Sequence, residues 1–314
     1  MSAAMAASAR AGSQRIPGAL NVAVAAVMLA ANACLLWAAS HAATWVGVLL
    51  AAAAFSYANN TVYSLLHECV HRKFHRSPRV NEWFGRILSA SFPTGFTFHR
   101  LCHLGHHRRN RTEVERFDYY EPGDNRLLKY LQWYGILTGL YWFIPPLGCV
   151  FVLLVPRRVL LRAIDTRGSK TAEHLGAEAM LEGVGSASGT RMRLEILFSL
   201  AVQVIVWRLL DLSIAGWAAC YAAFALNWSA LQYADHAFSE LDVRDGAWNL
   251  RVSRVVQYIF LNYHHHRAHH QHPDVPWIHL GRFVDFSAPR PSFIAIYLRM
   301  WKGPRPLPRE HQHV

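Results

Sequence analysis

The chain has 314 residues, of which 53% are hydrophobic and only 17% are charged, and its formal net charge is +12. An average soluble domain has about 25% charged residues, so this balance favours a membrane protein. Arg and Lys fall mostly between apolar stretches, as they do in cytoplasmic loops that face anionic lipid headgroups. This pattern argues against a nucleic-acid-binding protein, which would carry its basic residues in one stripe.

The five cysteines form no C-x-x-C pair, which argues against a disulfide framework and a cysteine-ligated metal or iron–sulfur site. Residues 1–17 are weakly basic, and we expect a disordered tail there. The apolar run that follows could pass for a signal peptide, but its length and the second apolar run directly after it favour a retained helix. We predict full transmembrane helices over residues 18–40, 44–66, 194–210 and 213–235.

Residues 130–155 are also apolar, but Pro145-Pro146 interrupts them, so we expect a broken or re-entrant segment. The predicted fold class is an all-α, integral membrane helical bundle with about four full spans and a histidine-rich cap. Residues 18–300 would form one domain, and residues 301–314 a flexible tail. The Arg-rich segments place the cap and both termini in the cytoplasm. The Ala- and Arg-rich composition, without a long targeting extension, suggests a bacterial inner membrane.

Histidine is unusually frequent, at 19 residues. Eight of these histidines form three clusters. Within a cluster the members are spaced i, i+3 or i+4 along the chain, which places them on one face of a helix. Every cluster falls at a predicted cytoplasmic edge of the membrane, where buried imidazoles would cost desolvation energy unless they were paired or coordinated. The clusters are His67 with His71; His103 with His106 and His107; and His266 with His269 and His270.

Eight imidazoles are more than one ion can bind, because a tetrahedral zinc ion takes four ligands. The clusters therefore predict two metal ions. Imidazole binds Fe, Zn, Cu and Ni alike, so the ligand type alone does not select the metal.

In order, spacing and membrane placement the three clusters resemble the histidine boxes of the membrane fatty-acid desaturase and hydroxylase superfamily. Arg100 before the second box and the run from His270 through Pro273 and Pro276 to Trp277 resemble that family's flanking sequence. The resemblance covers roughly residues 45–285.

The resemblance implies a non-haem di-iron centre with O₂ as co-substrate. It implies the eight clustered histidines as ligands, with His236 as a further candidate because the family often adds one histidine before the third box. Asn262 is a candidate to hold a water molecule or a ligand near one iron, and Glu68 and Asp235 are candidates to orient ligand imidazoles. His99 and His265, like His75 and His264, lie outside the boxes, and we regard them as outer or neutral residues.

By resemblance, the reaction is oxidation of a lipid-like substrate from the membrane, and the boxes look more like those of acyl desaturases than of hydroxylases. Hydroxylation, ketolation and decarboxylating alkene formation remain alternatives within the superfamily. No haem, ferredoxin or rubredoxin segment is fused to the chain, so we expect a separate ferredoxin, rubredoxin or cytochrome-type electron donor. We expect no nucleic-acid partner.

Two interpretations outside the superfamily also remain open. Residues 67–71 read H-E-x-x-H, the motif of zinc metalloproteases in which Glu68 would be the general base, but this leaves the other two clusters unexplained. A metal transporter or sensor would place its ligands near the bilayer midplane, whereas these clusters lie at helix ends.

Overall fold

The structure of the protein is a computed structural model, which describes residues 14–164 and 182–308. The described residues are predominantly helical, and their only strands are two segments of two residues each, which confirms the all-α fold class. Most of the predicted N-terminal tail, and residues 309–314 of the predicted C-terminal tail, lie outside the described residues. The elements in chain order are α2 (Gly18–His41), α3 (Trp45–Val70), α4 (Pro78–Ala90), α5 (Phe96–Arg109), β1 (Tyr119–Tyr120), α6 (Arg126–Leu137), η1 (Leu140–Phe143), α7 (Ile144–Leu154), α8 (Arg157–Ile164), η2 (Glu182–Gly185), α11 (Gly189–Leu209), α12 (Ile214–Ala234), α13 (Arg254–Ile259), α14 (His266–Gln271), α15 (Trp277–Leu280), η3 (Gly281–Phe283), α16 (Phe293–Met300) and β2 (Arg305–Pro306).

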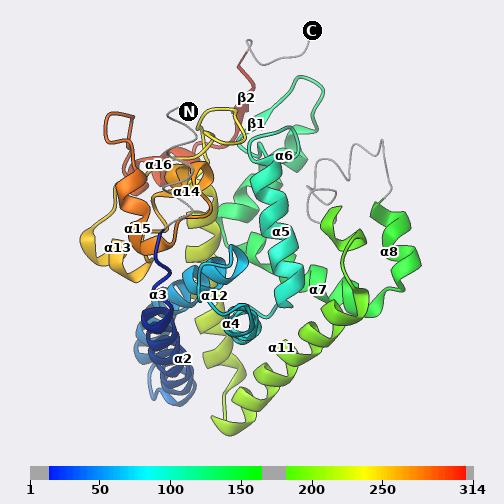
Figure 1. Ribbon diagram of the computed structural model, residues 1–314, viewed down its shortest axis with the longest axis vertical. Helices are drawn as coiled ribbons and strands as arrows, with labels where there is room; N and C mark the ends of the chain where they lie inside the picture. The colour runs from blue at the N-terminus through cyan, green and yellow to red at the C-terminus, as the bar shows by residue number, and fades with distance from the viewer. Residues whose placement is uncertain (1–13, 165–181, 309–314) are drawn as a thin grey trace.

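Four long helices, α2, α3, α11 and α12, lie at the positions of the four predicted membrane spans (Figure 1). Two of them, α2 and α12, are long and apolar enough to cross a membrane. The other two are less apolar, because α3 carries Asn59, Asn60 and Glu68 and α11 carries several charged residues near its start. Four full spans therefore stay a prediction.

The predicted broken segment consists of α6 followed by η1 and α7, and the two parts meet at an angle of 89°. Taken together as one bent span, the two parts are also long and apolar enough to cross a membrane. They are therefore a third candidate span. The turn is made at Gly139, whose φ of 85° favours glycine, and a Cβ there would lie 2.8 Å from the backbone of Leu226. Pro145 and Pro146 lie in the first turn of α7, where a missing amide hydrogen costs nothing. Glycine makes the break, and the proline pair starts the next helix.

The helices α2, α3 and α12 pack side by side in the lower half of the molecule (Figure 1). The backbone of α12 approaches α2 so closely at Gly216 that a Cβ would lie 2.6 Å from the backbone of Ser40. Asn32 of α2 donates a hydrogen bond of 2.8 Å to Asn59 of α3, and both side chains are buried. Because an unpaired amide costs free energy in an apolar medium, this pair fixes how the two helices face each other.

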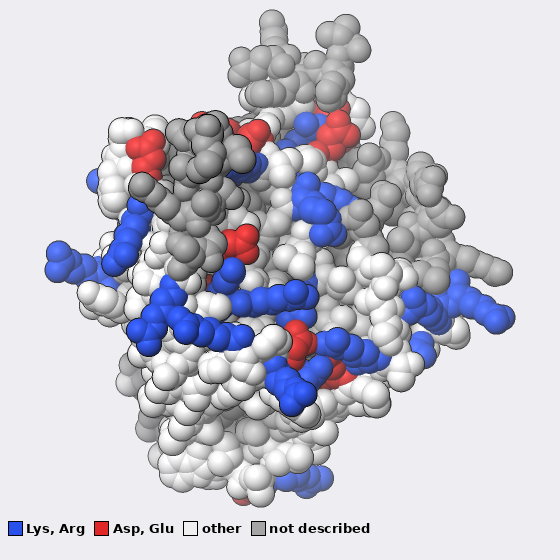
Figure 2. Space-filling model, in the orientation of Figure 1, with Lys and Arg blue, Asp and Glu red and all other residues white. Residues whose placement is uncertain are grey.

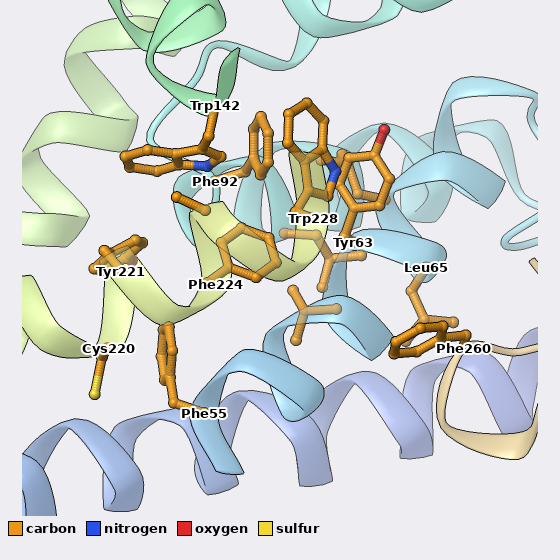
Figure 3. Close-up of a cluster of buried hydrophobic side chains, with 14 of the residues drawn as sticks. Phe55, Tyr63, Leu65, Phe92, Trp142, Cys220, Tyr221, Phe224, Trp228 and Phe260 are labelled. Carbon is orange, nitrogen blue, oxygen red and sulfur yellow. The ribbon is translucent and has the colours of Figure 1, made fainter. Parts of the chain in front are cut away.

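An aromatic core fills the space between α3 and α12 (Figure 3). The rings of Phe92 and Trp228 lie 4.8 Å apart between centroids, and those of Tyr63 and Trp228 lie 5.5 Å apart. Trp142 of η1 adds its ring to the same core. Large rings that contact one another on several sides have few alternative rotamers, so this core fixes the end of α3 that carries the first histidine pair.

The segments after α12 form short helices that pack against the C-terminal half of α3. Thr61 and Ser64 of α3 donate hydrogen bonds of 2.6 and 3.1 Å to the carbonyl oxygens of Ile259 and Phe260. Further on, β2 pairs in parallel with β1, and Leu307 is buried. The first part of the segment that we expected to be a flexible tail is thereby packed against the rest of the domain.

Candidate metal centre

The predicted ligand histidines lie on three helices and on one turn. His67 lies in the last turn of α3, and His71 is the residue that caps that helix. The second cluster lies in the C-terminal half of α5, and the third makes up half of the short helix α14. His236 follows directly after Asp235, the C-terminal cap of α12. Segments separated by most of the chain therefore bring their imidazoles to one place.

Five of the histidines form a first group, in which the ring nitrogens lie within 4.8 Å of one another. The Nε2 atoms of His71 and His103 are 2.9 Å apart, and the Nε2 atom of His107 lies 3.0 Å from those of His103 and His269. An unprotonated imidazole nitrogen has one lone pair, so Nε2 of His103 cannot accept ordinary hydrogen bonds from two rings. A cation between the nitrogens would take up all of these lone pairs. The members of this first group are His67, His71, His103, His107 and His269.

The remaining four predicted ligands form a second group, again with ring nitrogens within 4.8 Å of one another: His106, His236, His266 and His270. The two groups are neighbours, because the rings of His107 and His270 stack with centroids 4.4 Å apart.

The position of a histidine within its box correlates with the group that it joins. In all three boxes the two residues at i and i+4 belong to the same group, as His103 and His107 do. The residue at i+3 points to the other group, as His106 does on α5 and His269 does on α14. Positions i+3 and i+4 differ by about 100° around a helix of 3.6 residues per turn. Two helices therefore contribute to both groups and hold them at a fixed separation.

Hydrogen bonds orient two imidazoles of the second group. Nδ1 of His106 lies 2.6 Å from Oε2 of Glu115, and Nδ1 of His236 lies 2.9 Å from the carbonyl oxygen of Gly246. A proton on each Nδ1 leaves the Nε2 lone pair free to bind a metal ion. Neither partner was predicted from the sequence. Glu115 lies nine residues after His106, outside any box, and a backbone carbonyl has no sequence signal.

Burial favours the neutral form of several ligand imidazoles outside the long helices. It lowers the pKa of His71 to about 3 and lowers the pKa values of His103 and His107 well below the usual range of imidazole, with neighbouring histidines as the second cause for His103. The same holds for His236, His266, His269 and His270. A neutral imidazole is the form that binds a metal ion.

The donor set fits metal ions better than it fits an ordinary protein interior. The ring atoms Nε2 of His67, Nε2 of His270 and Nδ1 of His266 are buried and have no hydrogen-bond partner among the described residues. Unpaired polar atoms in a protein interior cost about 1–3 kcal/mol each, and coordination would remove that cost. Nine imidazoles in groups of five and four match two ions.

Among the described residues, no hydrogen bond joins the side chain of Glu68, Asn262 or Asp235 to a ligand imidazole, and their roles around the centre stay predictions. Glu68 is buried and accepts a hydrogen bond of 3.2 Å from the backbone amide of Trp277. The side chain of Asn262 binds Gln257 at 2.9 Å and the carbonyl oxygen of Trp277 at 3.1 Å. Both oxygens of Asp235 are buried without a hydrogen-bond partner among the described residues, and burial raises the pKa of this carboxyl well above its usual range.

The histidines outside the boxes are also placed by the structure. His99 is buried edge-on against the rings of Tyr63 and Phe92, with centroids 5.8 and 5.4 Å apart, and burial lowers its pKa to about 4. His265 caps the N-terminus of α14, and its ring lies 3.9 Å from that of His264. His75 accepts a hydrogen bond from the amide of Ser77. Neither metal group includes any of these four residues.

A cavity of about 140 Å³ adjoins the two groups. One wall contains ligand candidates of both groups, His103 from the first and His106 and His236 from the second. The other walls come from α3, α5, α12 and the broken segment, and they include Tyr63, Tyr141, Ile144, Trp228 and Gln232. A substrate in this cavity would lie against the imidazoles.

Comparison with known proteins agrees with this geometry. The sequence model of one protein family, described as fatty acid desaturase, matches residues 39–294, which contain both histidine groups. The search of curated proteins found no match.

Proposed function

The chain belongs to the fatty acid desaturase family, and from this premise we propose that it is a membrane-bound, O₂-dependent di-iron oxidoreductase that desaturates a fatty acyl chain. The observation that supports this most strongly is the division of the three boxes and His236 into groups of five and four ring nitrogens. A single-metal enzyme would have no use for a second group of clustered imidazoles.

Two iron ions, when bound, would supply the activation of O₂ and the removal of hydrogen from a methylene group. The chain itself holds the imidazoles in place and keeps them neutral. Glu115 and the carbonyl oxygen of Gly246 keep the protons of His106 and His236 on Nδ1, away from the centre. The cavity walls would exclude water and hold the reacting carbon atoms against the imidazoles.

The surface supports the proposed membrane position and donor. Figure 2 shows Lys and Arg in a band across the middle of one face, above a lower part with almost no charged side chains. We propose that the lower part lies in a bacterial inner membrane, and that the histidine cap and both termini face the cytoplasm. The basic face would bind a separate ferredoxin, rubredoxin or cytochrome-type electron donor.

Metal and product analysis on one sample tests the proposal. The full chain is purified in detergent, iron and zinc are counted per chain, and a reductase, a ferredoxin and O₂ are supplied. We expect about two irons per chain and, by mass spectrometry, lipids lighter by two hydrogens. Two irons with lipids heavier by one oxygen would assign hydroxylation instead. One zinc without O₂ dependence would overturn the proposal in favour of a protease with Glu68 as base, although that reading leaves six of the eight clustered histidines without a role.

A further inference from the structure

The side-chain amide of Gln232 occupies an unusual position in the wall of the cavity. Its Oε1 atom lies 3.2 Å from the hydroxyl of Tyr63 and 2.9 Å from the hydroxyl of Tyr263. Both hydroxyls donate to this one oxygen. These two hydrogen bonds restrain the orientation of the Gln232 amide group. The Nε2 atom is buried and has no hydrogen-bond partner among the described residues.

An unsatisfied amide nitrogen in an apolar setting costs free energy, and it is tolerated when a ligand supplies the missing acceptor. Three other polar side chains of the wall have partners within the protein, whereas the buried Nε1 of Trp228, like Nε2 of Gln232, has none among the described residues. Glu115 binds His106, Asn110 donates to the carbonyl oxygens of Val243 and Gly246, and Tyr233 binds Asp118. Gln232 is therefore a donor in this wall that is held in place but not yet paired.

The size of the cavity limits how far the acceptor can be from the reacting carbon. The cavity measures about 140 Å³, and a cavity of about 150 Å³ holds one benzene molecule, that is, roughly six heavy atoms. The same small space is bounded by Gln232 on one side and by His103, His106 and His236 on another. It therefore holds only a short segment of a long lipid at one time.

The bend in the broken segment forms part of the same wall. Tyr141, Ile144 and Pro145 line the cavity close to the 89° bend between α6 and α7. Irregular backbone at membrane depth is tolerated where it lines a cavity or is buried in protein. The break between two helices therefore forms part of the cavity wall.

We propose that Gln232 positions the substrate by donating a hydrogen bond to an oxygen atom of the lipid, such as an ester, thioester or carboxyl oxygen. The oxidised carbon then lies within about six atoms of that oxygen, because both must fit into one cavity. This inference rests on the proposed function for the reaction, but the binding step needs neither iron turnover nor O₂. A plain hydrocarbon, which has no acceptor, would bind less well than an oxygenated lipid of equal size.

Binding is tested on the full-length protein in nanodiscs by displacement of radiolabelled methyl palmitate. The competitors are unlabelled methyl palmitate and nonadecane, which has the same number of heavy atoms. We expect Gln232→Met to lower the ratio of ester affinity to hydrocarbon affinity about three- to tenfold. A factor of this size corresponds to the loss of one hydrogen bond. Gln203→Met is the matched control, because Gln203 bonds to Ala90 and Tyr221 away from this cavity, and it should leave the ratio unchanged.

A second variant keeps the inference testable if Gln232→Met does not fold. Tyr63→Phe removes one of the two hydroxyls that hold the Gln232 amide, and it should lower the same ratio by a smaller factor. An unchanged ratio in both variants would overturn the inference.

The position of oxidation gives an independent readout. Products formed by the iron-loaded protein are fragmented in the mass spectrometer to locate the new functional group. A double bond or hydroxyl within about six carbons of the carbonyl supports the inference. Oxidation in the distant half of the chain would overturn the inference and leave the proposed function intact. No oxidation at all, together with a lowered binding ratio, would overturn the proposed function and leave the Gln232 site intact.

Discussion

At the scale of single residues, the second histidine group differs from the first in how its rings are held. His106 and His236 are fixed from outside, by a carboxylate and by a backbone carbonyl oxygen. The first group instead has its Nε2 atoms 2.9–3.0 Å from one another. The second group therefore depends on residues that are not themselves ligands.

Glu115→Ala removes the acceptor for Nδ1 of His106, which lies 2.6 Å away. We expect about a 10- to 100-fold loss of iron affinity at one of the two sites, because the ring loses its orientation and its fixed tautomer. Competition with a chelator, followed by iron counting, measures this. Glu113→Ala changes an exposed glutamate nearby and is the control. Equal iron affinity in both variants would contradict the role of Glu115.

His99 should make the metal-free protein less stable in acid. Its pKa is about 4 in the folded protein because of burial, whereas it is about 6.5 in an unfolded chain. The folded-state pKa is depressed, so the stabilisation is complete above pH 6.5 and is lost as the pH falls toward 4. His99→Phe keeps the contacts with Tyr63 and Phe92. It should reduce the slope of the unfolding free energy against pH by up to about 1.4 kcal/mol per pH unit. Melting temperatures measured across this range test it, and identical slopes for both proteins would contradict it.

At the scale of elements, the close approach of α12 to α2 depends on Gly216. A Cβ at this position would lie 2.6 Å from the backbone of Ser40, and backbone atoms cannot move aside cheaply. We expect Gly216→Ala to lower stability by about 1–3 kcal/mol, the usual cost of overpacking. Thermal unfolding in detergent measures the change.

The matched control for this variant is Gly123→Ala. A Cβ added at Gly123 would meet nothing within 4 Å, so the melting temperature should change little. If the two alanine variants melt at the same temperature, the crossing of α2 and α12 is less tight than the structure indicates.

At the scale of the whole molecule, the excess positive charge should govern the encounter with the electron donor. The net charge is +12, and Lys and Arg form a band on the face shown in Figure 2. We expect the reduction rate with an acidic ferredoxin to fall steeply as ionic strength rises, because salt screens the attraction. Reduction by a small uncharged reagent is the control and should hardly change. A rate with ferredoxin that does not depend on salt would contradict docking on the basic face.

The predicted bounds of the long helices agree well with the structure where a continuous run of apolar residues marks the helix. The expected span at 18–40 is α2 (Gly18–His41), and the one at 213–235 is α12 (Ile214–Ala234). The helix expected from 194 begins at Gly189, because Ser188 caps it and its first turns are charged. The helices α13, α15 and α16 were not predicted, since segments this short show no readable periodicity, whereas the spacing of His266, His269 and His270 implied α14.

The sequence by itself determined which side chains gather at the centre, because an i, i+4 pair on one helix face is a local property of the chain. It also determined the long apolar helix α3, at whose C-terminal end the first of these pairs lies. Only the tertiary structure decided that His106 and His269 leave their box partners for the other group, that Glu115 and Gly246 orient two rings, and that Gln232 faces the cavity. These features depend on how α3, α5, α12 and α14 cross. That crossing is set by packing between residues far apart in the chain, which no local pattern contains.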